Sequence, residues 1–311
     1  MSDRPLEGRV ALVTGASRNI GRGIAIELAA SGAAVYATGR TTGDPSGTGD
    51  GLDATVSQAK ELGGQCVGLR CDHANDDEVA DVFERIASDH GQLDILVNNA
   101  SPDFSSMVGR PFWELPFDAM SVCLDIGPRS NFVATALAAR MMIPKASGLI
   151  VNISSHGARR HLLSVPYGVG KAGIDKLTAD TALELAGQGV AVISLWPGLV
   201  KTERIMSQAV AGEDGRLLMA GLDLSIGESP RFPGRAIAAL FTDPKVLERS
   251  GQALRTQQVA GDYGFTDVDG NVPPDLTNLA EYLGGADKIP PFWRGVERFP
   301  GAVGAEDEAL T

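Results

Sequence analysis

Short apolar runs recur along most of the chain, and longer segments of mixed polarity separate them. The runs are rich in Val and Ile and too short for buried helices, so they predict buried strands. Six such strands are expected, at Val10–Val13, Ala34–Thr38, Cys66–Leu69, Leu93–Val97, Leu149–Ile153 and Val190–Leu195.

The separating segments carry apolar residues at helical spacing. In one of them Val79, Val82 and Ile86 fall on a single face, as in an amphipathic helix. Helices are expected over Ile20–Ala30, Asp76–His90 and Lys171–Leu185. Strands that alternate with helices form a parallel sheet with helices on both faces, so the pattern predicts an α/β fold.

Three regions break this alternation. Thr41–Gly51 is rich in Gly, Asp and Thr and predicts a flexible loop, whereas Thr202–Pro230 is interpreted as a helical segment that contains Met and Gly. Towards the C-terminus, Asp267–Gly270 predicts a turn, and Pro pairs and acidic residues predict loosely held chain. We expect one domain over residues 1–261 and an irregular extension over 262–311.

The composition fits a folded protein and narrows its partners. Hydrophobic residues make up 43% of the 311 residues and charged residues 21%, as in a globular domain. A net charge of -12 argues against nucleic-acid binding, which needs a basic face. No apolar run approaches the ~20 residues of a membrane span, and the polar N-terminus lacks a signal-peptide core. We expect a cytoplasmic protein with no membrane partner.

The three cysteines, Cys66, Cys71 and Cys123, do not make a disulfide framework. Cys66 and Cys71 lie at the two ends of one short apolar strand, and His73 follows. One alternative is therefore that these three residues bind a metal. Structural zinc sites usually take four ligands, and no convincing fourth ligand lies nearby. We predict no metal.

The stretch Thr14–Gly23, TGASRNIGRG, joins the first predicted strand to the first helix. Ligands of open parallel sheets bind beyond the carboxyl ends of the strands. Gly15 tolerates a positive φ, Gly21 permits a close approach, and the helix start offers N–H groups to a phosphate. The alternative is a tight turn with no ligand. Asn19 departs from the generic G-x-G-x-x-G pattern. Among residues other than glycine, however, Asn tolerates the left-handed region best.

The end of the second predicted strand indicates which cofactor binds. Tyr36–Arg40 carries no acid that would bond a ribose 2′-hydroxyl. Arg40 and Arg18 are instead placed to meet a 2′-phosphate, which guanidinium groups suit. A lone Arg is usually a solvated surface charge, but two at these places predict NADP(H).

Tyr167 and Lys171 lie one helical turn apart, so their side chains share a face. A nearby cation lowers the pKa of a phenol, as proton transfer at working pH requires. Alone, such a pair is often incidental. Other strand ends reach the same edge of the sheet, at Asn98–Ala100 and Trp196–Thr202, and Ser154 offers a hydroxyl to a substrate oxygen.

Together these motifs resemble the short-chain dehydrogenase/reductases, a family of single-domain oxidoreductases, from about Gly8 to Gly261. The motifs that carry the resemblance are, in order, Thr14–Gly21, Asp72, Asn98–Ala100, Ser154, Tyr167 with Lys171, and Pro197–Gly198. Other stretches resemble one subgroup known from animals, namely Val165–Ala172, Ser194–Gly198 and Tyr263–Gly270. The family implies a Rossmann-like doubly wound sheet of about seven strands.

The resemblance implies catalytic roles. Tyr167 would be the general acid for carbonyl reduction or the base for alcohol oxidation. Lys171 would bond the nicotinamide ribose and lower the pKa of Tyr167, and Ser154 would hold the substrate oxygen.

The resemblance also implies a cofactor site. Asp72 would accept from the adenine amine, Asn98 would stabilise the neighbouring strand and contact the cofactor, and Val200 and Thr202 would hold the carboxamide. Residues 202–230 would form a substrate lid. The full set of implied cofactor-binding residues is Gly15, Ser17, Arg18, Asn19, Ile20, Gly21, Arg40, Asp72, Asn98, Ala100, Tyr167, Lys171, Pro197, Gly198, Val200 and Thr202.

Three residues depart from the family pattern. Asn19 replaces the middle glycine, Ser101 follows Asn-Asn-Ala where glycine is usual, and Asp125 aligns with a catalytic Asn of a proton relay. We expect the carboxylate of Asp125 to pair with Lys171 and to raise the pKa of that lysine.

The leading hypothesis is an NADP(H)-dependent oxidoreductase that interconverts a carbonyl and a secondary alcohol. One alternative, prompted by Asn19 and Asp125, is a nucleotide-binding regulatory protein without turnover. Another is an isomerase or lyase on the same scaffold, which the glycine spacing favours less.

The substrate and the assembly are predicted only in outline. Apolar residues of the expected lid predict an apolar substrate pocket, although packing on the core explains them equally well; they are Met206, Leu217, Leu218, Met219 and Leu222. The family implies a homodimer or homotetramer formed through the helices that carry Asp125 and Tyr167.

Overall fold

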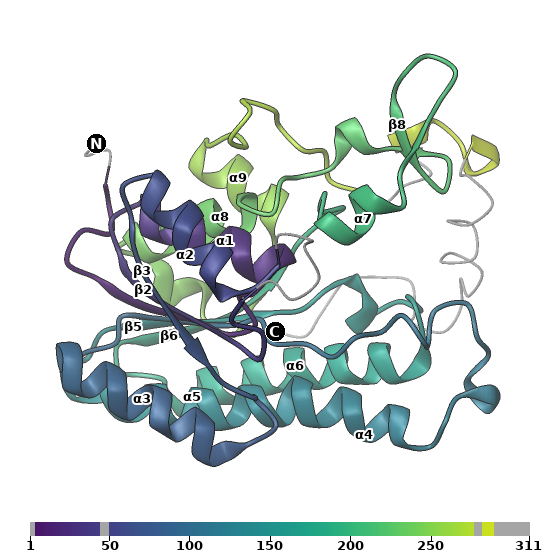
Figure 1. Ribbon diagram of the computed structural model, residues 1–311. Helices are drawn as coiled ribbons and strands as arrows, with labels where there is room; N and C mark the ends of the chain where they lie inside the picture. The colour runs from purple at the N-terminus through teal and green to yellow at the C-terminus, as the bar shows by residue number, and fades with distance from the viewer. Residues whose placement is uncertain (1–3, 44–49, 277–281, 289–311) are drawn as a thin grey trace.

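The computed structural model describes residues 4–43, 50–276 and 282–288. A seven-stranded parallel sheet lies at its centre, in the order β10-β6-β5-β4-β1-β2-β3 (Figure 1). The strands are β1 (Val10–Val13), β2 (Ala34–Gly39), β3 (Gln65–Arg70), β4 (Ile95–Asn98), β5 (Gly148–Ile153), β6 (Val190–Trp196) and β10 (Ala253–Arg255). The expected doubly wound α/β fold is confirmed, and all six predicted strands form.

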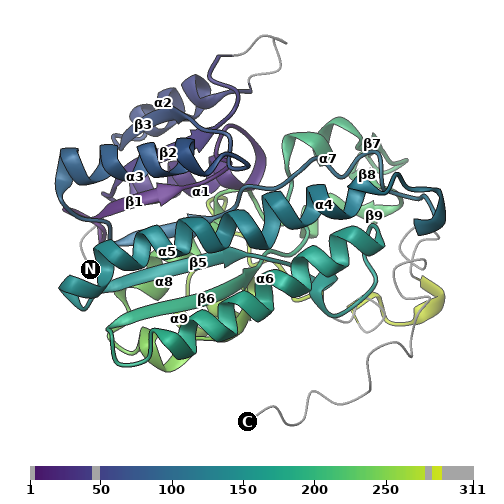
Figure 2. The same cartoon turned by 90° about the horizontal axis from the view of Figure 1, so that it is seen from below.

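Helices cover both faces of the sheet (Figures 1 and 2). One layer consists of α1 (Asn19–Ala30), α2 (Leu52–Glu61), α8 (Phe232–Thr242) and α9 (Thr256–Tyr263). The other consists of α3 (Asp76–His90), α4 (Asp118–Leu124), α5 (Ser130–Met142) and α6 (Val165–Glu184). Each layer seals its own apolar cluster against the sheet, the first around Ile24 and Ile237 and the second around Val79 and Phe83. Burial on both faces explains why the central strands are mostly apolar, whereas the edge strand β3 is largely exposed.

Single-turn segments join several of these elements. The 3₁₀ turns are Phe112–Glu114, Ile143–Lys145, His156–Ala158, Leu224–Ile226, Val246–Arg249 and Ala286–Lys288, and a π-helical segment, Asp125–Arg129, separates α4 from α5.

The helix α6 begins earlier than its apolar spacing predicts. Ser164 caps its first turn by accepting a hydrogen bond from the backbone N–H of Tyr167 (3.4 Å), and Pro166 occupies a first-turn position. Both features favour a helix start. Tyr167 therefore lies in the first turn of α6, close to the edge of the sheet.

The sequence predicts that the region Thr202–Pro230 is helical, but most of it is not. Only α7 (Glu203–Ser207) is an α-helix, and a small antiparallel sheet follows, formed by β7 (Val210–Ala211), β8 (Leu217–Met219) and β9 (Leu222–Asp223). Ala220 and Gly221 connect β8 to β9 with φ of 49° and 85°. Two such residues form the tight turn that hairpins prefer, and helical spacing does not reveal it.

The C-terminal part follows the prediction in one respect. Asp267–Gly270 forms the expected turn, closed by a hydrogen bond from Gly270 N–H to the carbonyl of Asp267 (2.9 Å). The helix α9 crosses the expected boundary at residue 261, so the division into domain and extension stays a prediction. The middle of the loop 41–51, the pair Pro290 and Pro291, and Glu306–Glu308 lie outside the described residues.

Within the described ranges, no helix is both long and apolar enough to cross a membrane. Over the same ranges, no three His, Cys, Asp or Glu side chains gather as metal ligands would. The three cysteines are buried and free. His73 instead lies with its Nε2 at 2.8 Å from the hydroxyl of Thr38.

Candidate active site

A cavity of about 2350 Å³ lies at the carboxyl ends of the strands. A pocket for one small ligand usually measures roughly 300–1,000 Å³, so this cavity has room for a dinucleotide and a substrate. Every residue predicted to bind the cofactor lines it except Asn98, and Ser154, Tyr167 and Lys171 line it as well. Asp125 is not among the lining residues.

The turn after β1 has the conformation that the sequence predicted. Gly15 and Asn19 have φ of 65° and 54°, so Asn19 does adopt the left-handed region. A Cβ on Gly21 would lie 2.3 Å from Nδ2 of Asn99, which shows why glycine is needed there. The same Nδ2 donates to the carbonyls of Thr14 (2.9 Å) and Gly15 (3.0 Å). Asn99, which sequence reasoning missed, therefore holds this turn, Gly15–Gly21, in place; it is called the phosphate turn below because phosphate binding is predicted there.

Asn98 occupies a different position from the one predicted. Its side chain is 2% exposed, and its Nδ2 donates to Asn152 Oδ1 (2.8 Å) and to Thr135 Oγ1 (3.1 Å). Asn152 in turn donates to Thr178 on α6 (2.9 Å). Neighbouring strand residues point to opposite faces, so Asn98 joins β4 to β5 and α5 while Asn99 reaches the turn. The expected strand contact is present, but Asn98 does not line the cavity.

Asp50 adds a negative charge near the phosphate turn. The choice of cofactor is predicted only from the residues at the end of the second strand, which do not include it. Arg18 and Arg40 both line the cavity. Asp50, from the segment before α2, also lines it and lies 3.7 Å from Arg18 and 3.7 Å from Arg22. A 2′-phosphate would compete with Asp50 for Arg18.

A carboxylate from the expected lid, residues 202–230, contacts the start of α1. Glu203, the first residue of α7, accepts a hydrogen bond from the backbone N–H of Asn19 (3.0 Å) and one from Arg22 (3.1 Å). A helix N-terminus favours such an anionic partner. The expected lid and the turn after β1 are therefore in direct contact.

Ser155, and not Ser154, faces the tyrosine. Ser155 Oγ lies 2.7 Å from Tyr167 Oη, whereas Ser154 donates to the backbone carbonyl of Lys171 (3.3 Å). The strand β5 ends at Ile153, so strand alternation does not decide between the two serines. Ser155 also caps the 3₁₀ turn His156–Ala158 by accepting from Gly157 N–H (3.0 Å), and this turn directs its hydroxyl to Tyr167.

Burial controls the protonation of Tyr167. Its side chain is 8% exposed, and burial raises the pKa of Tyr167 while the bond to Ser155 opposes the rise. Gly157 makes this burial possible, because a Cβ there would lie 2.4 Å from the tyrosine ring. The expected lowering of the tyrosine pKa by Lys171 is not found, since desolvation is the largest effect.

Lys171 is buried beside the tyrosine. Its Nζ donates to the carbonyl of Ile153 (2.9 Å) and lies 5.8 Å from the Tyr167 ring centre. Burial lowers the pKa of Lys171 to about 8, and the charge of Asp175 opposes this effect. Asp175 follows one turn later on α6 and accepts hydrogen bonds from Ser194 Oγ (2.7 Å) and Trp196 Nε1 (3.2 Å).

The predicted pairing of Asp125 with Lys171 is wrong. Asp125 is exposed at the start of the π-helical segment, where the chain kinks at Gly127. Gly127, not Asp125, lines a small cavity that also contacts Tyr167 and Lys171. The acid that acts on the pKa of Lys171 is Asp175.

The wall of the cavity formed by the expected lid and Trp196 is less apolar than the sequence predicted. Met219 and Leu222 line the cavity, but Met206, Leu217 and Leu218 do not. The ring of Trp196 contacts His156 edge-on at 5.2 Å and lies under the guanidinium of Arg159 at 5.5 Å. Apolar and cationic groups therefore share this wall.

Comparisons with known proteins agree with this fold. The short chain dehydrogenase family matches residues 9–211. Dehydrogenase/reductase SDR family member 1 of Mus musculus is 42% identical over 286 residues, which cover 90% of this chain and 89% of that protein.

Two solved structures are also similar. A 7α-hydroxysteroid dehydrogenase complexed with NADH and 7-oxo glycochenodeoxycholic acid shares 27% identity with a TM-score of 0.66, over 82% of this chain and 95% of that one. A metagenomic short-chain oxidoreductase in complex with NADP shares 26% identity with a TM-score of 0.63, over 81% of this chain and 98% of that one. Together, the fold, the cavity and these likenesses establish that the chain belongs to the short-chain dehydrogenase/reductase family, in the subgroup of the mouse relative.

Proposed function

We propose that this protein is an NADP(H)-dependent oxidoreductase that interconverts a carbonyl group and a secondary alcohol on a small molecule in the cytoplasm. The proposal is carried by the 2.7 Å contact between Ser155 Oγ and Tyr167 Oη. Both hydroxyls line the cavity that also contains the phosphate turn. One cavity thus offers a cofactor site and a proton donor.

Tyr167 supplies the proton in this proposal. Because burial raises its pKa, the phenol is neutral near pH 7 and ready to donate from Oη to a carbonyl oxygen. In the opposite direction, the same oxygen accepts the proton of an alcohol. Ser155, at hydrogen-bond distance from Oη, would hold the substrate oxygen and stabilise its developing charge. Lys171 places a buried amino group next to the phenol.

The residues of the phosphate turn fit a dinucleotide. Gly15 and Gly21 keep the turn compact, and the start of α1 supplies donors to a pyrophosphate. Val200 and Thr202 line the cavity further along, where the carboxamide would be held. When bound, NADP(H) would supply or take up the hydride.

Arg18 and Arg40 favour the phosphorylated cofactor. Related structures contain NADP in one case and NADH in another, so the choice depends on the residues around the ribose. Asp50 beside Arg18 weakens the preference for NADP(H), but its single negative charge does not offset the positive charges of two guanidinium groups.

The decisive experiment measures NADPH oxidation against a panel of carbonyl compounds, with NADH in parallel. Tyr167→Phe should lower turnover by about 10²–10⁴-fold and leave NADPH binding unchanged. A wild-type protein that binds NADPH but turns over no compound would contradict the proposal and favour a regulatory role. A product formed without net cofactor oxidation would favour an isomerase or lyase.

We also propose a homodimer or homotetramer. Apolar side chains are exposed along α4, α5 and α6, which lie side by side on one face of the molecule (Figure 2). They are Val122, Phe132, Val165, Val169 and Leu183. Val169→Asp should reduce the mass in light scattering to that of one chain, whereas Leu247→Asp, at an exposed position elsewhere, should not. An unchanged mass for Val169→Asp would exclude this face.

A further inference from the structure

The lid, residues 202–230, joins the core through two stems that lie side by side. The incoming stem consists of residues 199–201, and the outgoing stem of residues 228–229. Lys201 N–H donates to the carbonyl of Glu228 (2.8 Å), and Glu228 N–H donates to the carbonyl of Leu199 (2.8 Å). The chain thus enters and leaves the lid at one place. Any group that binds this place acts on both ends of the lid.

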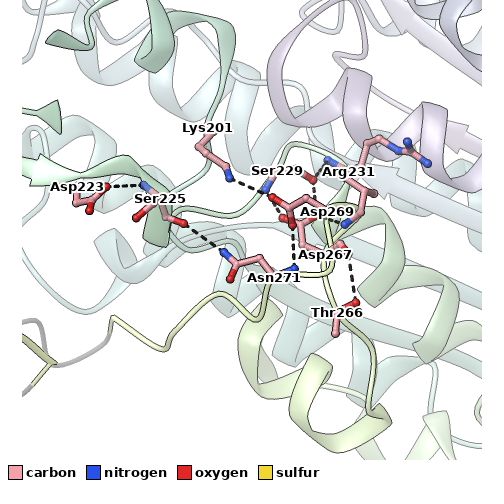
Figure 3. A network of polar contacts seen from close by, with 10 residues as sticks. Lys201, Asp223, Ser225, Ser229, Arg231, Thr266, Asp267, Asp269 and Asn271 are labelled. Atoms are coloured by element: carbon pink, nitrogen blue, oxygen red, sulfur yellow. Dashed lines mark hydrogen bonds and ion pairs between the residues drawn. The ribbon is translucent and has the colours of Figure 1, made fainter. Parts of the chain in front are cut away.

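A turn of the C-terminal extension binds the outgoing stem. This C-terminal turn, Asp267–Asn271, contains Asp267, a residue that is 1% exposed. Figure 3 shows Asp267 facing Ser229. Asp267 accepts hydrogen bonds from the backbone N–H of Ser229 (2.6 Å), from its hydroxyl (2.6 Å) and from Val268 N–H (2.7 Å). Hydrogen bonds to a charged group are among the stronger ones in proteins.

The same turn contacts the incoming stem and the interior of the lid. Asp269 lies 3.8 Å from the ammonium of Lys201, and Asn271 Nδ2 donates to the carbonyl of Ser225 (3.2 Å) (Figure 3). Ser225 N–H donates in turn to Asp223 (2.8 Å), the last residue of β9. One five-residue turn therefore holds both stems and the hairpin of the lid.

Beyond the turn, the extension reaches the cavity. Asp275 forms an ion pair with Arg255 at 2.9 Å, and Leu276 lines the cavity. Arg255 also lines it, together with Met219 and Leu222 of the lid. The extension and the lid thus contribute to the wall of one cavity.

We propose that the C-terminal turn is a positioning element of the substrate site, and that Asp267 acts through it to hold the lid in the position that binds substrate. The inference goes beyond the proposed oxidoreductase activity, and its effect on substrate affinity rests on that activity. Asp267 contacts the lid and not the reacting groups, so its loss should affect substrate binding more than the chemical step.

The test compares variants of the full-length chain. Asp267→Ala should raise KM for a carbonyl substrate from the panel by about tenfold, as the loss of charged hydrogen bonds implies, with kcat within about twofold. Amide hydrogen exchange should become faster across residues 202–230 but not in β4 or β5. Asn271→Ala, which loses only the bond to Ser225, should show the same pattern more weakly.

Asp262→Ala is the matched control, because Asp262 pairs with Arg249 (2.8 Å) at the start of the extension and away from the lid. It should change neither KM nor lid exchange. A folded Asp267→Ala protein with wild-type KM and lid exchange would overturn the proposal. If that variant does not fold, unchanged exchange in both Asn271→Ala and Ser229→Ala would overturn it. Hydrogen exchange needs no turnover, so it tests the positioning role even if the proposed activity fails.

Discussion

The two ends of the cavity hold their charged groups in different ways. At the phosphate turn, the side chain of Arg18 is 55% exposed and faces Asp50 at 3.7 Å. At the catalytic end, Lys171 bonds a backbone carbonyl and its pKa falls to about 8 through burial. Exposed cations can attract an anionic cofactor without losing their charge, whereas buried groups acquire altered proton affinities. In the proposed function, cofactor recognition and proton transfer are thus separated in space.

After the loss of Tyr167 itself, the largest effect is expected at Ser155. Ser155→Ala removes the hydroxyl at 2.7 Å from Tyr167 and should lower kcat by about 10²–10³-fold, as for the loss of one donor to a developing oxyanion. Ser154→Ala should cost about tenfold or less, because that hydroxyl only bonds backbone and Asp175. Steady-state kinetics of both variants checks the assignment, and the reverse ranking would restore Ser154 as the substrate contact.

The cofactor end should respond in affinity and not in turnover. Arg18→Ala and Arg40→Ala should each weaken NADPH binding about tenfold, as loss of an interaction with phosphate implies, and should leave NADH binding unchanged. Asp50→Asn should have the opposite effect, because it frees Arg18 for the 2′-phosphate. Fluorescence titration measures the dissociation constants of both cofactors. Equal losses for NADPH and NADH would show that the arginines do not read the 2′-phosphate.

The pH dependence should separate the two ends further. A lysine with a lowered pKa loses its charge earlier as pH rises, so activity that needs the ammonium should decline above about pH 8. Asp175 raises the pKa of Lys171, so Asp175→Asn should shift this decline to lower pH. Asp180→Asn, which removes an exposed partner of Lys176 on the same helix, is the control. An unshifted profile for Asp175→Asn would remove Asp175 from the proton chemistry.

The smallest effect is expected at Asp125. Its carboxylate is exposed and is not among the groups that act on the pKa of Lys171. Asp125→Asn should therefore leave both kcat and the pH profile unchanged. A clear shift in the pH profile would mean that the carboxylate of Asp125 does act on the pKa of Lys171 or Tyr167.

The sequence predicts the sheet well because most of its strands are buried on both faces. The strands β1, β2, β4, β5 and β6 are almost entirely buried and mostly apolar, whereas the edge strand β3 is largely exposed. The three-residue strand β10 and the lid strands were not located. Such short strands are defined by pairing and by residues with positive φ, such as Gly221, and not by periodicity.

The site could be predicted to the level of segments, but not always to the residue. Parallel strands bring their carboxyl ends together, so the motifs after β1, β4, β5 and β6 had to meet. The differences concern direction: Ser155 and not Ser154 faces Tyr167, Asn99 and not Asn98 bonds the turn after β1, and Asp175 and not Asp125 acts on the pKa of Lys171. Beyond the last residue of a strand or at a helix kink, regular spacing no longer fixes where a side chain points.

The amides beneath the site have a consequence for folding. Asn98 bonds Asn152, and Asn152 bonds Thr178, so a polar ladder crosses β4, β5 and α6 within an apolar interior. If β4 and β5 paired one residue out of step, the bond between the two amides would be lost, and Asn152 Oδ1 would be buried without this donor, at a cost of about 1–3 kcal/mol. The ladder therefore favours one alignment of β4 with β5 while the chain folds, and its last bond, from Asn152 to Thr178, holds β5 beside α6, the helix that carries Tyr167.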